Sequence, residues 1–174
     1  QSEVGDSEEE IKRLEDSLEA LAILKDYTSP WPLGSDGKPV TDGDTVTSSS
    51  TNGGGGDELY SRRLPFMTLV KDPWSVLEPQ LGAGTVSKLV PLADPLRLSV
   101  GEFYARLVKG MLGAGISGGA SPSRPVPVFS ALQPWLDKIK DPALACMTAQ
   151  SVALDMTRSA DQLEALRMAA RHAV

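Results

Sequence analysis

The chain has 174 residues, of which 41% are apolar and only 5% aromatic, so it holds about one domain with a modest, mostly aliphatic core. Its net charge of −6 at pH 7 is concentrated in residues 1–58, which carry 14 acids against 4 bases. With no basic run to neutralise phosphates, the composition disfavours a nucleic-acid-binding protein. The single cysteine, Cys146, excludes an internal disulfide and any metal site built from several cysteines. No stretch reaches the ~18 consecutive apolar residues that a transmembrane helix needs.

An acidic amphipathic helix is the first predicted element, over residues 7–27 of an acidic segment 1–27. Ser7 and Glu10 have the spacing of a capping box, in which side chains satisfy free amides at a helix start. Aliphatic residues then recur every three or four positions, which places them on one face of a helix: Ile11, Leu14, Leu18 and Leu21. Because the opposite face is charged and nothing apolar follows to cover this one, we predict that these four side chains bind a partner protein.

Residues 28–58 form a Pro/Ser/Gly-rich stretch that predicts a flexible arm or linker. Such a composition buries too little apolar surface to offset the entropy of ordering the chain. Trp31, between Pro30 and Pro32, is the exception. Two interpretations stay open: Trp31 binds in a pocket of a partner protein, or it packs on the first helix of its own chain.

Residues 59–174 are predicted to form a helical body with long irregular connections. The apolar run Leu64–Val70 predicts a short strand or an extended docking segment. Asp72 followed by Pro73 predicts the N-cap and first residue of a short helix. The next stretch, residues 85–98, contains two prolines and is predicted to be extended or irregular.

The later part of the chain predicts several helices from their start signals. These signals are Ser99 with Glu102, Ser130 with Gln133, Asp141 with Pro142, and Ser159 with Gln162. We expect the helix after Ser99 to end at Gly113, where glycine adopts a left-handed C-cap conformation at little cost. The segment after Ser159 is either a separate helix or a continuation of the preceding one.

A glycine motif within residues 111–121 has the spacing of a dinucleotide-binding fingerprint: Gly113, Gly115 and Gly118. In that fold a strand leads into the glycines and a helix starts directly after them. Here a predicted helix leads into Gly113 and prolines follow Gly118, so we predict a helix end and no cofactor site. The small-residue spacing at Gly110 predicts a close approach to a neighbouring helix.

Catalytic and metal-binding residues are sparse in this sequence. Cys146 would need a nearby base, and the only histidine, His172, is the third residue from the C-terminus. We therefore predict that Cys146 is a buried structural cysteine. Residues 81–88 lack the spacing of a phosphate-binding loop, and the aspartates of residues 36–44 lack that of a calcium loop. Both stretches predict turns, and the sequence predicts no cofactor and no metal.

Together these features predict a mainly α fold: a small irregular helical domain with long extended loops and an N-terminal amphipathic helix on a flexible arm. They favour a non-catalytic accessory or structural subunit that docks to other protein subunits of a larger assembly. The chain begins at Gln1 without an initiator methionine, so two interpretations stay open: a terminus left by removal of a targeting peptide, or an artificial boundary of the chain. On the first interpretation we expect a mitochondrial or chloroplast protein at the periphery of a membrane complex. Two other classes stay open: a small-ligand or lipid-binding helical module, its cavity lined by Phe103, Leu107 and Met111, and a small enzyme.

Overall fold

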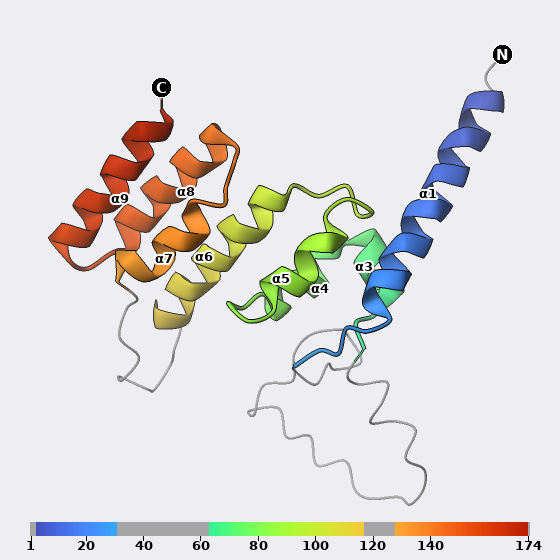
Figure 1. Cartoon of the computed structure of the whole chain (residues 1–174), viewed down its shortest axis with the longest axis horizontal. Helices are drawn as coiled ribbons and strands as arrows, with labels where there is room; N and C mark the ends of the chain where they lie inside the picture. The colour runs from blue at the N-terminus through green and yellow to red at the C-terminus, as the bar shows by residue number, and fades with distance from the viewer. Residues whose placement is uncertain (1–2, 31–62, 117–127, 174) are drawn as a thin grey trace, which may run out of the picture. The chain divides into compact units, whose positions relative to one another are not determined.

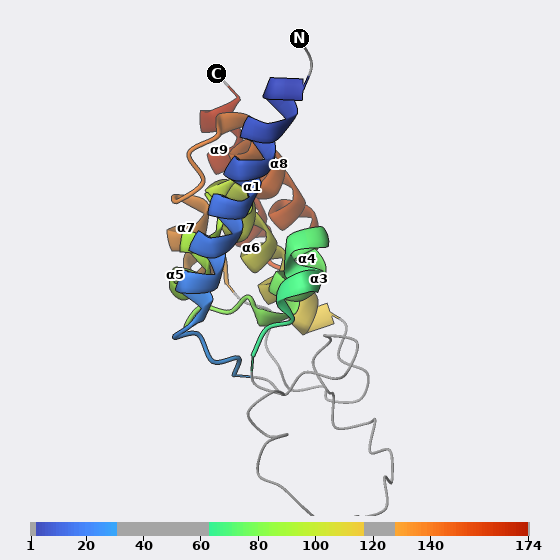
Figure 2. The ribbon, with the colours of Figure 1, turned by 90° about the vertical axis from the view of Figure 1, so that its right-hand side faces the viewer.

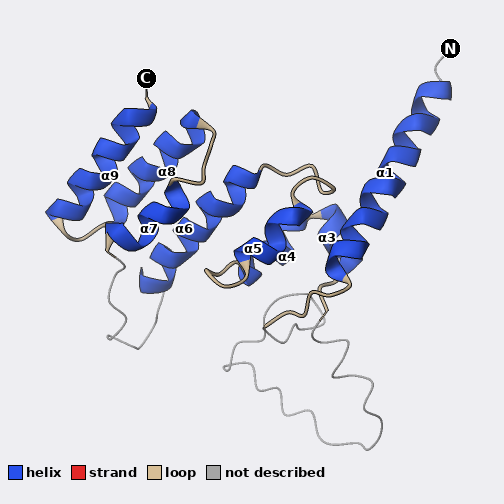
Figure 3. Ribbon diagram, in the orientation of Figure 1, coloured by secondary structure: helices blue, strands red, loops and turns tan. Residues whose placement is uncertain are grey.

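The computed structural model describes residues 3–30, 63–116 and 128–173, and within these ranges the chain is helical with no strand (Figure 1, Figure 3). The expectation of a mainly α fold is confirmed. The chain divides into two compact units, the first comprising Gln1–Gln80 and Pro91–Arg97, the second Leu81–Val90 and Leu98–Val174. Most of the expected arm, with Trp31, lies outside the described residues, and so does the glycine- and proline-rich stretch 117–127.

The described residues of the first unit form the N-terminal helix and two short helices. Its elements are α1 (Glu3–Leu24), α3 (Phe66–Lys71), α4 (Pro73–Leu77) and a 3-10 turn at Glu78–Gln80. Residues 63–80, expected to belong to the later helical body, cluster here with α1.

Helix α1 lies further toward the N-terminus than expected. Ser7, the expected N-cap, lies inside the helix, which begins at Glu3. No proline interrupts residues 3–7, so the helix extends one turn beyond the capping-box sequence. At its other end it stops at Leu24, three residues before the expected end.

The strand or extended segment expected at Leu64–Val70 is wrong, because these residues lead into and form α3. Periodicity does not separate helix from strand in so short an apolar run. As a helix, the segment buries Leu69 completely and leaves Met67 and Val70 exposed. Pro65 and Phe66, which precede Leu69 by four and three residues, are half-buried, and burial at this helical spacing is the reason for the difference.

The core of the first unit combines aliphatic side chains with a few buried polar groups. Its buried apolar residues are Ala20, Tyr27, Leu64, Leu69, Val76, Leu77, Leu92 and Ala93. Within it the Ser29 hydroxyl donates a hydrogen bond of 2.6 Å to Oε1 of Gln80. The hydroxyl of Tyr27 is buried and has no hydrogen-bond partner among the described residues. Burial also raises the pKa of this phenol above its ordinary value of 10.0.

The second unit contains one short and four longer helices. These are α5 (Val86–Leu89), α6 (Val100–Ile116), α7 (Phe129–Leu136), α8 (Pro142–Asp155) and α9 (Ser159–His172). The turn expected within residues 81–88 is confirmed, since the Gly82 amide donates to Oγ1 of Thr85 at 2.9 Å. The irregular chain expected after it is wrong in part, because α5 and a 3-10 turn at Val90–Leu92 follow directly. Pro91 fits there because the first turn of a helix needs no amide donor.

The end expected for the helix after Ser99 is also wrong. Ser99 directly precedes α6 as expected, but the helix passes through Gly113 and continues to Ile116. A glycine costs a helix interior only about 1 kcal/mol. The buried face of α6, with Phe103 and Leu107 at 0% and 1% exposure, keeps the helix in place despite that cost.

The close helix contact expected at Gly110 occurs at Gly101 instead. A Cβ at Gly110 would meet nothing within 4 Å. A Cβ at Gly101 would lie 3.1 Å from Cδ2 of Leu144 in α8 and 3.4 Å from Cγ2 of Ile139. The start of α6 therefore approaches α8 more closely than a larger residue would allow.

Two aspartate–proline helix starts are confirmed. The Asp72 carboxylate accepts a hydrogen bond from the Ser75 amide at 3.4 Å at the start of α4. The Asp141 carboxylate accepts from the Ala143 amide at 3.0 Å at the start of α8. In each case a side chain satisfies an amide that the helix itself leaves free.

The serine starts expected for α7 and α9 are misplaced. Ser130 lies inside α7 and Ser159 is the first residue of α9, and the residues before each helix make no side-chain cap. The first amide of α7, at Phe129, instead donates to Oδ1 of Asp161 in α9 at 3.3 Å. A long-range contact thus replaces the local capping box. Helix α9 is separate from α8, because Met156 is extended between them.

The core of the second unit lies between α6, α7, α8 and α9. Helices α8 and α9 form a hairpin and lie side by side in both views (Figure 1, Figure 2). Fully buried small residues mark this hairpin: Ala145, Ala149, Ala165 and Ala169. Small side chains let helix backbones approach closely, so this unit is held together by tight packing with few aromatics.

One aromatic cluster joins α6 to α7. The rings of Tyr104 and Trp135 stack with centroids 6.3 Å apart. The Lys138 ammonium lies 5.2 Å and 4.7 Å from the two ring centroids. These contacts add cation–π attraction at the edge of the core.

We predict opposite effects for two glycine substitutions in α6. Gly113→Ala should raise stability by up to about 1 kcal/mol, because alanine is the better helix former and the Cβ has open space. Gly101→Leu should lower it by about 1–3 kcal/mol through overpacking against Leu144. Urea denaturation followed by circular dichroism measures both. A destabilising Gly113→Ala would mean that Gly113 caps the helix after all.

A second prediction concerns alkaline pH. Burial raises the pKa of Tyr27 in the folded state but not in the unfolded chain. The stability that depends on the phenol staying neutral is therefore complete below the unfolded pKa of about 10. It is lost as the pH rises above that value. Tyr27→Phe removes the ionisable group. The urea midpoint of the wild type should therefore fall relative to that of the variant above about pH 10. Parallel pH profiles would show that Tyr27 is not buried in solution.

Candidate functional site

The four aliphatic residues singled out in the sequence form an exposed apolar stripe along α1. The exposed fractions are 55% for Ile11, 62% for Leu14, 66% for Leu18 and 44% for Leu21. Their spacing of three and four residues places them on one face of the helix. We call this surface the leucine stripe.

The opposite face of α1 makes the contact with the rest of the first unit. Ala20 is 0% exposed, whereas its neighbours on the leucine stripe are exposed. Asp16 accepts two hydrogen bonds through Oδ2 from the Arg97 guanidinium, at 3.2 Å from Nε and 3.0 Å from Nη2. Arg97 has a positive φ of 54°, unusual for a residue with a side chain. The backbone thus turns at Arg97, the residue whose guanidinium binds Asp16 of α1.

A shallow hollow accompanies this ion pair. It has a volume of about 230 Å³ and lies between Arg13, Asp16 and Ser17 of α1 and the turn that ends at Arg97. Asp16 and Arg97, whose ion pair attaches α1, both line it. This hollow therefore belongs to the attachment of α1 and is not a separate binding site.

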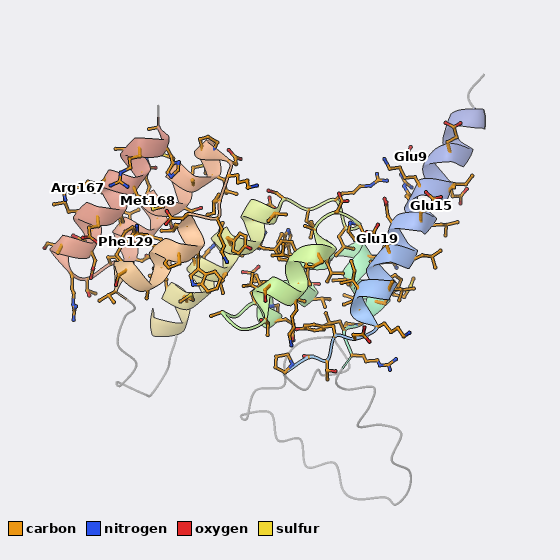
Figure 4. All side chains as sticks on the ribbon, viewed as in Figure 1. Glu9, Glu15, Glu19, Phe129, Arg167 and Met168 are labelled. Carbon is orange, nitrogen blue, oxygen red and sulfur yellow. The ribbon has the colours of Figure 1, made fainter. Side chains whose placement is uncertain are left out.

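Glutamates border the leucine stripe. The three that flank it by helical spacing, Glu8, Glu10 and Glu15, are all exposed. Glu9 and Glu19, also on α1 (Figure 4), lie further around the helix. Arg13 pairs with Glu9 at 2.9 Å across one helical turn, on the side away from the stripe. The surface available to a partner is consequently an aliphatic strip with carboxylates at its edges.

The spacing of the leucine stripe is visible in the sequence, but the contact that orients it is not. Ala20 and Asp16 are too small or too polar to be picked out as a packing face. The Asp16–Arg97 pair spans 81 positions, so no local pattern connects its members. Of the five predicted partner-binding residues, the structure brings four together on α1, and the fifth, Trp31, lies outside the described residues.

The residues considered for catalysis do not form a recognisable reactive group. Cys146 is a free, partly buried cysteine packed against the core of the second unit, and its sulfur accepts a hydrogen bond from Nε2 of Gln150 at 3.5 Å. Within the described ranges, no group of three or more His, Cys, Asp and Glu side chains could hold a metal ion. A helix, not a strand, precedes Gly113, which is the opposite of what a dinucleotide site needs.

Two surface hollows lie in the second unit. One, of about 360 Å³, lies between α6 and α8, where Lys109 and the 67% exposed Met147 are among its lining residues. The other, of about 240 Å³, lies between α7 and α9 and is lined in part by Phe129, Arg167 and Met168 (Figure 4). Neither is a deep apolar cavity of the kind that encloses a small ligand.

The side chains expected to line a ligand cavity pack differently. Phe103 and Leu107 are buried inside the second unit, and Met111 packs against its core. These residues therefore contribute to packing. No helix in the described part of the chain is long and apolar enough to cross a membrane.

Comparison of the chain with protein-family models, with curated proteins and with solved structures finds no match. Its chemistry must therefore be inferred from its own side chains. The exposed leucine stripe is the feature in which the surface of α1 departs most from that of an ordinary helix, because four large aliphatic side chains face water while the opposite face buries only Ala20 completely.

We predict that the two faces of α1 respond differently to substitution. Ala20→Leu should destabilise the first unit by about 1–3 kcal/mol, because its Cβ is fully buried and overpacking is costly. Leu18→Gln should change stability by less than about 0.5 kcal/mol, because Leu18 is exposed and both residues favour helix. Hydrogen exchange of the α1 amides together with urea denaturation measures the difference. Equal losses for the two variants would show that α1 packs through its leucines.

Proposed function

We propose that this protein is a non-catalytic accessory subunit that docks to another protein of a larger assembly through the leucine stripe of α1. One observation carries the proposal: Ile11, Leu14, Leu18 and Leu21 are all at least 44% exposed, while Ala20 on the opposite face is fully buried. A helix of an isolated globular protein normally buries its apolar face. The exposed apolar face of α1 is the arrangement expected of a helix that binds a partner protein through that face.

The leucine stripe supplies part of the free energy that docking needs. Fully burying one aliphatic side chain contributes about 1.5–3 kcal/mol relative to leaving it exposed. The four side chains are roughly half exposed, so covering them contributes on the order of 3–6 kcal/mol before association costs. A stable complex therefore needs further contacts beside the stripe, from its bordering charges or from other parts of the chain.

Packing in the second unit supports docking over ligand binding. Phe103 and Leu107 fill the core, and the hollows beside α8 and α9 lie among exposed side chains such as Met147 and Arg167. These surfaces suit contact with a protein better than enclosure of a small molecule. A peripheral place on an organellar membrane complex stays a prediction.

The test is purification of the full chain from its native source with the partner attached. The double variant Leu14→Gln, Leu18→Gln should lose the stoichiometric partner, because two of the four docking side chains become polar while helix propensity is kept. Leu154→Gln is the matched control, since Leu154 is an 85% exposed leucine of α8, in the second unit, and does not belong to the stripe. It should retain the partner.

Quantitative mass spectrometry of the purified material measures the loss, which should be at least about tenfold for two central aliphatic contacts. Circular dichroism checks that both variants keep the helicity of the wild type. Retention of the partner by the double variant at the wild-type level would refute docking through α1.

A further inference from the structure

We infer that the element docking on the leucine stripe is a helix of a different protein whose own apolar stripe is bordered by Lys or Arg, and that α1 does not pair with α1 of a second copy. The inference rests on the proposed function and specifies the chemistry of the partner. It depends on where the exposed glutamates of α1 lie relative to the stripe.

The stripe has the spacing of a coiled-coil seam. Ile11 and Leu18 are seven residues apart, and so are Leu14 and Leu21, which gives the alternating steps of three and four that define positions a and d of a heptad. All four side chains are exposed, so the seam is open to a second helix. A long helix of a partner protein therefore fits this surface better than a β-strand or the convex surface of a globular domain does.

Glutamates occupy the positions beside this seam. With Ile11 at position a, Glu8 and Glu15 fall at position e and Glu10 at position g. All three are exposed. Positions e and g are the ones from which side chains reach across to the partner helix and select it.

Pairing of two copies of α1 would bring like charges together. In a parallel pair, position g of one helix meets position e of the next heptad in the other, so Glu10 would face Glu15 on both sides of the seam. In an antiparallel pair centred on the stripe, the two Glu15 side chains would meet. Both arrangements place carboxylates side by side at the edge of an apolar contact, where water screens them less.

A partner with basic residues at these positions would turn the same contacts into attractions. The carboxylates flank the start and middle of the stripe, whereas the later e and g positions are occupied by the uncharged Ser17, Ala22 and Leu24. The partner's Lys or Arg residues are therefore expected opposite Glu8, Glu10 and Glu15, with an uncharged end opposite Leu21. This asymmetry sets the register of the partner helix along α1.

The probe is a synthetic helical peptide of three heptads with Leu at positions a and d and Lys at positions e and g. A second peptide of the same sequence but with Glu at positions e and g is the comparison. Fluorescence anisotropy with the full chain should show at least about tenfold tighter binding of the Lys peptide, because each flanking contact changes from repulsion to attraction. The difference should shrink at high salt.

Two variants separate the causes. Glu8→Lys, Glu10→Lys, Glu15→Lys should reverse the preference between the two peptides while keeping the leucine stripe. Leu14→Gln, Leu18→Gln should lose both peptides. All five substituted residues are exposed, so circular dichroism should show unchanged helicity.

Each outcome decides between the proposals. If the leucine variant binds the Lys peptide as well as the wild type does, the stripe is not a docking surface and the proposed function fails. If the leucine variant binds neither peptide but the wild type binds both equally, the docking surface stands and the inference about charge is wrong. Binding of neither peptide by the wild type, or its self-association through the stripe in analytical ultracentrifugation, also overturns the inference.

Discussion

The attachment of α1 through Ala20 and the Asp16–Arg97 ion pair is the constraint on which the functional surface depends. Ala20 is completely buried, and its small side chain lets that face of the helix lie close to the rest of the first unit. The guanidinium of Arg97 binds one carboxylate oxygen of Asp16 through two nitrogens. Once the face that carries Ala20 and Asp16 points inward, helical geometry forces the aliphatic residues one half-turn away to point outward.

This attachment is also a weak one. A partly exposed ion pair contributes at most about 1 kcal/mol, and an alanine buries little apolar area. Helix α1 is accordingly expected to be among the less stable elements of the chain, with local opening at low free-energy cost. A partner that covers the leucine stripe would stabilise the helix, because binding to the folded state alone shifts the folding equilibrium.

The second unit follows a different principle of packing. Its core combines alanines on α8 and α9 with larger side chains from α6 and α7, such as Phe103 and Leu136. Gly101 lets α6 approach α8 at a point where a Cβ would lie 3.1 Å from Leu144. A chain with only 5% aromatic residues thus obtains a dense core by bringing backbones close together.

The sequence alone determined what depends on near neighbours: the helical class, the aspartate–proline starts at Asp72 and Asp141, and the spacing of the leucine stripe. Periodicity and capping chemistry act within one or two turns, so they are visible in the order of residues. Tertiary structure decided the rest. The helix at Phe66–Lys71, the continuation of α6 through Gly113, the amide of Phe129 bound by Asp161, and the outward orientation of the leucine stripe all depend on residues far away in the sequence. No local signal records such contacts, because burial is a property of the assembled chain.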